Sequence, residues 1–155
     1  MQKLLITFGT RPLAQRLSKM LNNTFQIQFA TAEEVPSFLA ANYNKIPTGI
    51  NPTYAHELLK LCLDKEIDFI LPLGLSEIQT LAEAQVLFEE YGVEVLSPDK
   101  EFLEEIFVLE NPSSGVELSV LFNGKSLNNK SDVDQVISGL FTISDEGDDL
   151  ALCTI

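Results

Sequence analysis

The sequence predicts an α/β fold: an open parallel sheet with helices on both faces, followed by a small α+β appendage. Short apolar runs alternate with helical periods through the first hundred residues, and the joints between them are short. After Pro98 this alternation weakens and acidic residues accumulate. We therefore expect one α/β domain at residues 1–98 and an acidic α+β appendage at residues 99–155 that packs on it.

The first elements are predicted from hydrophobic pattern and from helix-capping residues. Residues 4–8 form an apolar run that stops at Gly9, which is typical of a strand buried on both faces. Thr10 is the expected cap of a helix with a stripe of apolar residues, namely Leu13, Leu17, Met20 and Leu21. Residues 25–29 alternate between apolar and polar, so they predict a second strand.

The next stretch predicts two helices with a short extended segment between them. Thr31 and Glu34 have the spacing of a capping box, so a short helix through Phe38 is expected. Residues 43–47 are predicted to be extended. Asn51-Pro52 then places a cap and a first-turn proline before a helix with apolar residues on one side, including Leu58, Leu59 and Cys62.

Two more strands complete the predicted sheet. Residues 67–71 form one, closed by Pro72 and Gly74, and residues 93–96 form the other. Between them, Ser76 and Gln79 have capping-box spacing at the start of a helix that Gly92 ends. Strands that alternate with helices in this way favour right-handed crossovers and parallel pairing.

The appendage is expected to contain two hairpins and two helices. Residues 101–109 and 132–140 are predicted to be helical, and residues 116–122 form a strand. Asn123-Gly124 is a strong turn signal that folds this strand back toward Ser126. A second hairpin joins residues 141–144 to residues 150–155 around the acidic loop 145–149.

Composition and charge exclude several classes of function. The chain has 155 residues, of which 45% are hydrophobic and 21% charged, so it is expected to be globular. No apolar run approaches a membrane span and the N-terminus lacks the features of a signal peptide, so we expect a cytoplasmic protein. The net charge of −13 opposes binding to nucleic acids and to anionic membranes, and residues 101–155 alone carry −9.

The sequence predicts no metal and no cofactor. His56 is the only histidine, and the two cysteines, Cys62 and Cys153, are interpreted as reduced structural residues. Nothing matches the G-x-G-x-x-G pattern of a dinucleotide site. The acidic cluster of Asp145, Glu146, Asp148 and Asp149 lacks the ligand spacing of a calcium loop, so a solvated turn is favoured over calcium binding.

Candidate ligand-binding residues lie in two loops that follow strands of the predicted sheet. They are Gly9, Thr10 and Arg11 in the first loop and Gly74, Ser76 and Glu77 in the second. Ligands of open parallel sheets bind beyond the carboxyl ends of the strands, and helix N-termini favour anions. A solvent-exposed Arg11, a capping Ser76 and a Glu77 at the helix dipole are the alternative interpretations. No catalytic residues can be assigned.

An ordered set of short motifs runs through the first two-thirds of the chain, namely residues 42–47, residues 51–54, Leu58-Leu59, Cys62, residues 67–72, Glu77-Ile78 and Leu81-Ala82. With these motifs the chain resembles the pre-ATP-grasp domain, a Rossmann-like domain of carbamoyl-phosphate-synthase-like and other ATP-grasp ligases. Leu75 stands where the family usually has an aspartate, and only some fifty-five residues follow the resembling part.

The resemblance implies a function without catalysis. The tail is too short for the module that binds ATP and magnesium, so we expect a stand-alone binding or assembly module that does not catalyse the ligase reaction alone. Its partner would be a separate ATP-grasp protein or another copy of the chain. The alternative is an enzyme or substrate-binding domain for a small anionic or nucleotide-like ligand.

Overall fold

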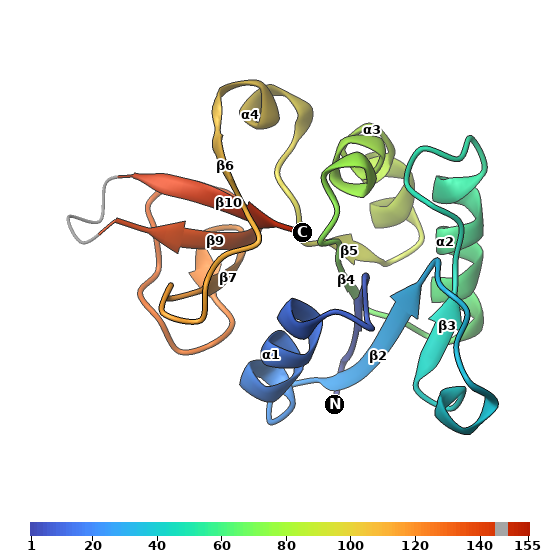
Figure 1. Ribbon diagram of the computed structural model, residues 1–155. Coiled ribbons are helices and arrows are strands. Elements are labelled where there is room, and N and C mark those ends of the chain that lie inside the picture. Colours follow the sequence, from blue (N-terminus) through green and yellow to red (C-terminus); the bar gives the residue numbers. More distant parts are fainter. Residues whose placement is uncertain (145–148) are drawn as a thin grey trace.

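A five-stranded parallel sheet forms the N-terminal part of the computed structural model, which describes residues 1–144 and 149–155 (Figure 1). Its strands are β1 (Lys3–Ile6), β2 (Gln26–Thr31), β3 (Tyr43–Lys45), β4 (Phe69–Leu71) and β5 (Glu94–Val95). Their order is β3-β2-β1-β4-β5, and every neighbouring pair is parallel. The predicted α/β class and parallel sheet are confirmed, and the segment predicted to be extended adds the edge strand β3.

Helices cover both faces of this sheet, as predicted. Helix α1 (Pro12–Leu21) packs on one face, where Leu17 meets Leu4 in one hydrophobic core. Helices α2 (Tyr54–Asp64) and α3 (Leu75–Glu90) lie on the opposite face, where Leu58 and Leu81 meet Leu5. Residues 4, 5 and 6 of β1 thus point alternately into two cores, which explains why all three are apolar.

Two helices begin later than the capping signals predict. Thr10 does not cap α1: its hydroxyl donates to Glu33, and Arg11 stands at the cap position without a side-chain bond. Helix α2 begins at Tyr54 rather than at Pro52. The Oδ1 atom of Asn51 accepts from the backbone N–H of Thr53, which holds residues 51–53 in a turn before the helix starts.

The two predicted capping boxes are both wrong. Thr31 ends β2 and its hydroxyl accepts from the backbone N–H of Glu33, so it closes a turn, and only the short 3₁₀ helix η1 (Ser37–Leu39) follows. Helix α3 begins at Leu75, with Gly74 at the cap and Glu77 in its first turn. The side chain of Glu77 accepts a hydrogen bond from the N–H of Gly74. The cap is therefore Gly74, two residues before the predicted cap Ser76.

A short helix and a second five-stranded sheet form the C-terminal part. Their bounds are α4 (Lys100–Glu105), β6 (Phe107–Glu110), β7 (Ser119–Phe122), β8 (Lys125–Ser126), β9 (Gly139–Ile143) and β10 (Leu150–Thr154). The strand order is β6-β10-β9-β7-β8; the β6–β10 pair is parallel and the other pairs are antiparallel. The predicted helix at 101–109 stops early because residues 107–110 pair with β10 instead.

Both predicted hairpins are confirmed, whereas the helix at 132–140 is wrong. Asn123 and Gly124 have φ angles of 50° and 84°, which suit the two-residue turn between β7 and β8. Strands β9 and β10 form the second hairpin. Residues 132–138 instead fold back on the first hairpin, where the N–H of Gly124 donates to the carbonyl of Ile137. Residues 145–148 of the acidic loop lie outside the described residues.

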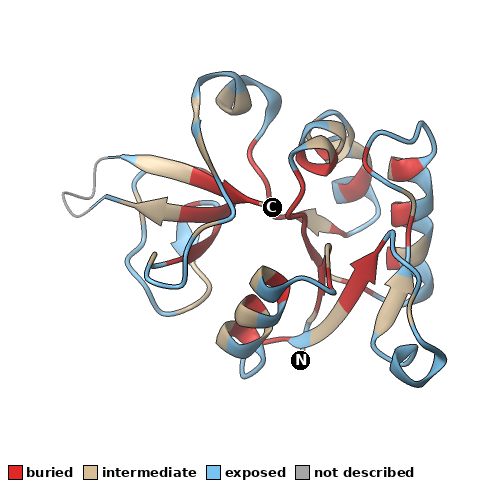
Figure 2. Cartoon of the chain, in the orientation of Figure 1, coloured by how far each residue is buried: buried red, intermediate tan, exposed pale blue. Residues whose placement is uncertain are grey.

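The second sheet packs on the same face of the first sheet as α1. Val120, Leu140 and Cys153 lie in one hydrophobic core with Leu4 and Leu17. Figure 2 shows buried segments of both parts beside the chain's end at Ile155, where the two sheets approach each other. The division at residue 98 into two domains stays a prediction. Within residues 1–144 and 149–155, no helix is both long and apolar enough to cross a membrane.

Candidate functional site

The two loops that hold the candidate residues lie side by side at one edge of the sheet. Strands β1 and β4 are parallel neighbours, with Ile6 opposite Leu71. The chain builds β2 and β3 on one side of β1 and then returns to place β4 on the other side, so the direction of winding reverses between β1 and β4. The crevice at such a reversal is the usual ligand site of open α/β sheets.

Glu77 is buried in this crevice, and the surrounding chain supplies all its hydrogen bonds. Its Oε1 atom accepts from the Thr7 hydroxyl at 2.6 Å and from the N–H of Gly74 at 3.2 Å. Its Oε2 atom accepts from the Tyr54 hydroxyl at 2.9 Å. Only 3% of Glu77 is exposed. One carboxylate therefore joins the end of β1 to the first turns of α2 and α3.

Burial sets the electrostatics of this group. It raises the pKa of Glu77 above its usual 4.5, while hydrogen bonds from Thr7, Tyr54 and the loop backbone oppose the shift. Burial also raises the pKa of Tyr54, and the nearby charge of Glu77 raises it further. Among the ion pairs of the described residues, none includes Glu77. The carboxylate is held by hydrogen-bond donors rather than by a cation.

The two candidate glycines lie against aromatic side chains, Gly74 against Phe8 and Gly9 against Phe29 of β2. A Cβ atom on Gly74 would come within 2.4 Å of the Phe8 ring, and one on Gly9 would come within 2.5 Å of the Phe29 Cβ. The absence of a side chain at each position is therefore needed for packing. Phe8 itself has a φ of 51°, which turns the chain at the end of β1.

The other candidate residues do not point at Glu77. Arg11 lies over the Phe8 ring, 5.9 Å from its centroid, and its Nε is 3.4 Å from Glu33 Oε1. Thr10 donates to the same carboxylate. Ser76 lies under the loop before α2, where a Cβ on Gly49 would come within 2.7 Å of its hydroxyl. The structure thus brings Gly74 and Glu77 together and pairs Thr10 and Arg11 with Glu33. Ligand binding by these residues stays a prediction.

Sequence reasoning missed the partners of Glu77. Thr7 is the one residue of the run 4–8 with a polar side chain, and its buried hydroxyl both donates to Glu77 and accepts from the N–H of Leu73 at 2.8 Å. A lone hydroxyl residue at the carboxyl end of a buried strand is a usable signal for such a role. Tyr54 gave no comparable signal, because its fully buried position depends on how α2 packs.

A cavity of about 310 Å³ lies on the other side of Arg11, between α1 and the segment that links the two strands β6 and β7. Its lining includes Arg11, Arg16, Asn111 and Ser114, together with apolar side chains such as Leu13. Arg16 donates to the backbone carbonyls of Ser113 and Val116. These are the only two arginines of the chain.

Both cysteine side chains are buried. Cys62 and Cys153 are free thiols, and burial raises their pKa to about 12 and about 11. Thiolates are therefore scarce at neutral pH, as expected of structural cysteines. In the part of the chain that the structure describes, no three His, Cys, Asp or Glu side chains gather into a metal-binding group.

Comparison with protein families identifies the class of this fold and crevice. Residues 4–96 match the PylC-like N-terminal domain, and this match covers more than half of the chain. The domain is of the pre-ATP-grasp type, which precedes the catalytic module of ATP-grasp ligases. The chain belongs to the PylC-like N-terminal domain family, and the predicted resemblance is confirmed. A search of curated proteins found no match.

Proposed function

We propose that this chain is a non-catalytic binding and assembly module that works beside a separate ATP-grasp-type protein. The proposal rests on the family to which residues 4–96 belong and on the state of the crevice between β1 and β4. A domain of this kind precedes the catalytic module in ATP-grasp ligases.

The internal bonding of Glu77 is the observation that carries the proposal. A general acid, a general base or a ligand-binding carboxylate needs an oxygen that can reach the substrate. Both oxygens of Glu77 are engaged by Thr7, Tyr54 and Gly74, and the side chain is buried. The carboxyl group of Glu77 also occupies the N-terminus of α3, where it accepts from the N–H of Gly74 and leaves less room for another acceptor. The crevice is thus better suited to holding the fold than to chemistry.

Two measurements on the purified full chain test this function. We expect no ADP release above background when it is incubated with ATP, magnesium and a panel of carboxylates and amines. We also expect it to co-sediment with an ATP-grasp protein that lacks an N-terminal domain of its own. Sustained ADP release that is lost in both Arg11→Ala and Glu77→Gln would overturn the proposal.

A second candidate function is the binding of a small anion that carries an apolar group. The cavity between α1 and residues 111–114 favours it, because its lining includes both arginines of the chain together with apolar side chains. Hexanoate, with hexanol as the uncharged control, is a suitable probe for calorimetry. We expect Arg11→Ala to weaken binding of the acid by about 1.5–3 kcal/mol. Equal affinity for hexanoate and hexanol would exclude this candidate.

A further inference from the structure

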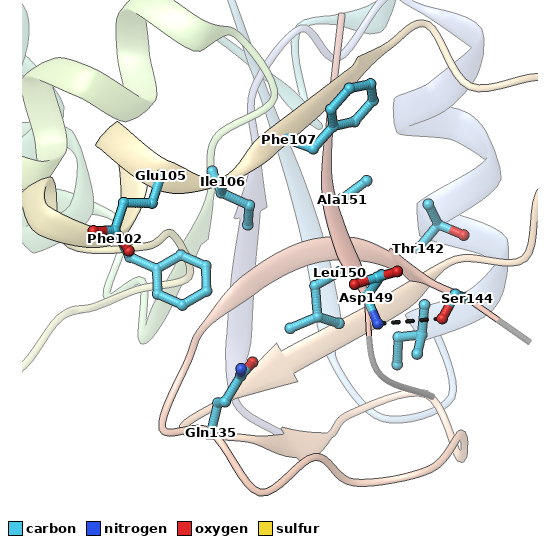
Figure 3. A pocket seen from close by; sticks show the side chains of 11 residues that line it. Phe102, Glu105, Ile106, Phe107, Gln135, Thr142, Ser144, Asp149, Leu150 and Ala151 are labelled. Atoms are coloured by element: carbon cyan, nitrogen blue, oxygen red, sulfur yellow. Dashed lines mark hydrogen bonds between the residues drawn. The ribbon is translucent and has the colours of Figure 1, made fainter. Parts of the chain in front are cut away.

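A groove of about 660 Å³ lies on the C-terminal part, away from the crevice (Figure 3). Its walls come from α4 with the start of β6 and from the β9–β10 hairpin. Phe102, Ile106 and Leu150 supply apolar side chains, while Gln135 and Thr142 supply polar atoms. The outer rim includes Phe107, which is 72% exposed.

The charge in this groove has one sign. Its lining contains two carboxylates, Glu105 and Asp149, and no lysine or arginine. Among the described residues neither carboxylate is part of an ion pair, although five other acidic side chains are. The two lysines of residues 101–155 lie elsewhere and pair with Asp132 and Glu117. The groove therefore combines exposed apolar surface with uncompensated negative charge.

In this groove an exposed aromatic side chain adjoins further apolar side chains and carboxylates. A contiguous apolar surface rimmed by polar groups, unlike a single exposed apolar side chain, often marks an interaction site. The carboxylates are exposed, so their contribution is mainly to attract and orient a cationic partner. A segment with both apolar and basic side chains complements both features at once.

We propose that this groove docks an extended segment of a partner protein in which basic and apolar side chains alternate. The apolar side chains cover Phe102, Phe107 and Leu150, and the basic ones approach Glu105 and Asp149. This proposal rests on the proposed assembly function and names the chemistry of the partner. It is independent of residues 4–96, because none of them lines the groove.

Other occupants fit the groove less well. Nucleic acids and anionic lipids are repelled by its carboxylates and by the net charge of −9 on residues 101–155. A second copy of the chain has few cations to offer, since it holds ten basic residues and five of them are already in ion pairs. A partner protein with a basic segment is therefore the occupant that the charges favour.

The test is a titration of the full chain with a fluorescein-labelled peptide in which lysine alternates with leucine and phenylalanine. Fluorescence anisotropy reports binding, and the same peptide with glutamate in place of lysine is the control probe. We expect the basic peptide to bind and the acidic one to fail. Phe107→Ala and Glu105→Lys should each weaken binding about tenfold.

Matched variants separate docking in the groove from general attraction to an acidic protein. Phe38→Ala removes an aromatic side chain that is 83% exposed on η1, and Glu90→Lys makes the same charge change on α3. Both should bind the basic peptide like the parent chain. All four substituted residues are exposed, so circular dichroism spectra should match the parent and exclude unfolding as the cause.

Three results would overturn the proposal. Equal weakening by Glu105→Lys and Glu90→Lys would show attraction to the overall charge. Binding unchanged by Phe107→Ala would show that the groove is not the contact surface. A dimer in sedimentation that Phe107→Ala dissociates would assign the groove to a second copy. Each of these can occur while the chain still co-sediments with an ATP-grasp protein, so they are distinct from failure of the proposed function.

Discussion

The crevice between β1 and β4 and the groove beside β9 and β10 use their acidic residues in opposite ways. In the crevice, Glu77 is buried and accepts three hydrogen bonds from the chain itself. In the groove, Glu105 and Asp149 are exposed and have no cationic partner among the described residues. The carboxyl group at the end of the sheet where α/β folds usually bind ligands is thus engaged by internal hydrogen bonds, whereas the carboxylates of the groove are open to solvent.

This difference has a physical origin in the second sheet. Strand β10 runs toward the carboxyl end of β4, where the N–H of Ile155 donates to the carbonyl of Leu73 at 2.9 Å. Its inner face shares a core with α1, while the far ends of β9 and β10 extend beyond that contact (Figure 1). The same sheet therefore covers one face of the first sheet and exposes a new surface at its other end.

The largest expected loss of stability comes from a substitution in the hydrophobic core that the two sheets share. Leu140 is 1% exposed in β9, so Leu140→Ala should destabilise the chain by about 2–5 kcal/mol. All three tyrosines lie before residue 98, so tyrosine fluorescence reports the first part alone. We expect urea to unfold the first part of this variant earlier than in the parent. An unchanged tyrosine transition would show that the two parts fold independently.

A smaller loss of stability is expected when Glu77 is replaced. Glu77→Ala leaves the hydroxyls of Thr7 and Tyr54 and the N–H of Gly74 without an acceptor, at a cost of about 3 kcal/mol. Glu77→Gln keeps an acceptor for Thr7 and Gly74 and should cost about 1 kcal/mol. Urea denaturation measures both, with Glu90→Ala as the exposed control. Equal losses for Ala and Gln would contradict the hydrogen-bonding role.

The pH dependence of stability is a further test of the buried state of Glu77. Burial raises the folded-state pKa of Glu77 above 4.5, so the folded chain keeps this proton over a range in which the unfolded chain has lost it. The resulting stabilisation is complete below the unfolded pKa and is lost as pH rises through the folded pKa. We expect the stability of the parent relative to Glu77→Gln to fall from pH 4.5 upward. A difference that stays constant would show an unshifted pKa.

The smallest effect on stability is expected for the ion pair between Arg11 and Glu33. The side chains of Arg11 and Glu33 are 49% and 53% exposed, so solvent screens their interaction. A double-mutant cycle of Arg11→Ala with Glu33→Ala should give a coupling free energy below about 1 kcal/mol that shrinks at high salt. A larger, salt-independent coupling would mean that this pair is a structural lock rather than a surface contact.

The sequence was sufficient for the first sheet because its strands carry their own pattern. The unbroken apolar run of β1 and the alternation in β2 are local features, and both predict the observed elements. Helix starts were harder to predict, since the hydroxyls of Thr10 and Thr31 bond elsewhere than at the predicted caps and α3 begins before Ser76. A serine or threonine in the sequence indicates that a turn or a helix start is near. Tertiary contacts decide at which residue the helix begins.

The second sheet was predicted only in part, for a topological reason. Hairpins join neighbours in sequence, so Asn123-Gly124 was enough to predict the turn between β7 and β8. The pairing of β6 with β10 joins segments about forty residues apart, and no local pattern encodes it. Likewise, Val133 and Ile137 have helical spacing, but both are held against the core by a folded-back loop.

Amide chemical shifts of the full chain test the central contrast most directly. We predict that the basic peptide shifts amides in residues 102–107, 142–144 and 149–151, and that ATP with magnesium shifts none in residues 7–11 and 74–77. The first set lines the groove and the second surrounds Glu77. The contradicting result is a saturable shift at residues 74–77 on addition of ATP, with no change in the groove when the peptide is added.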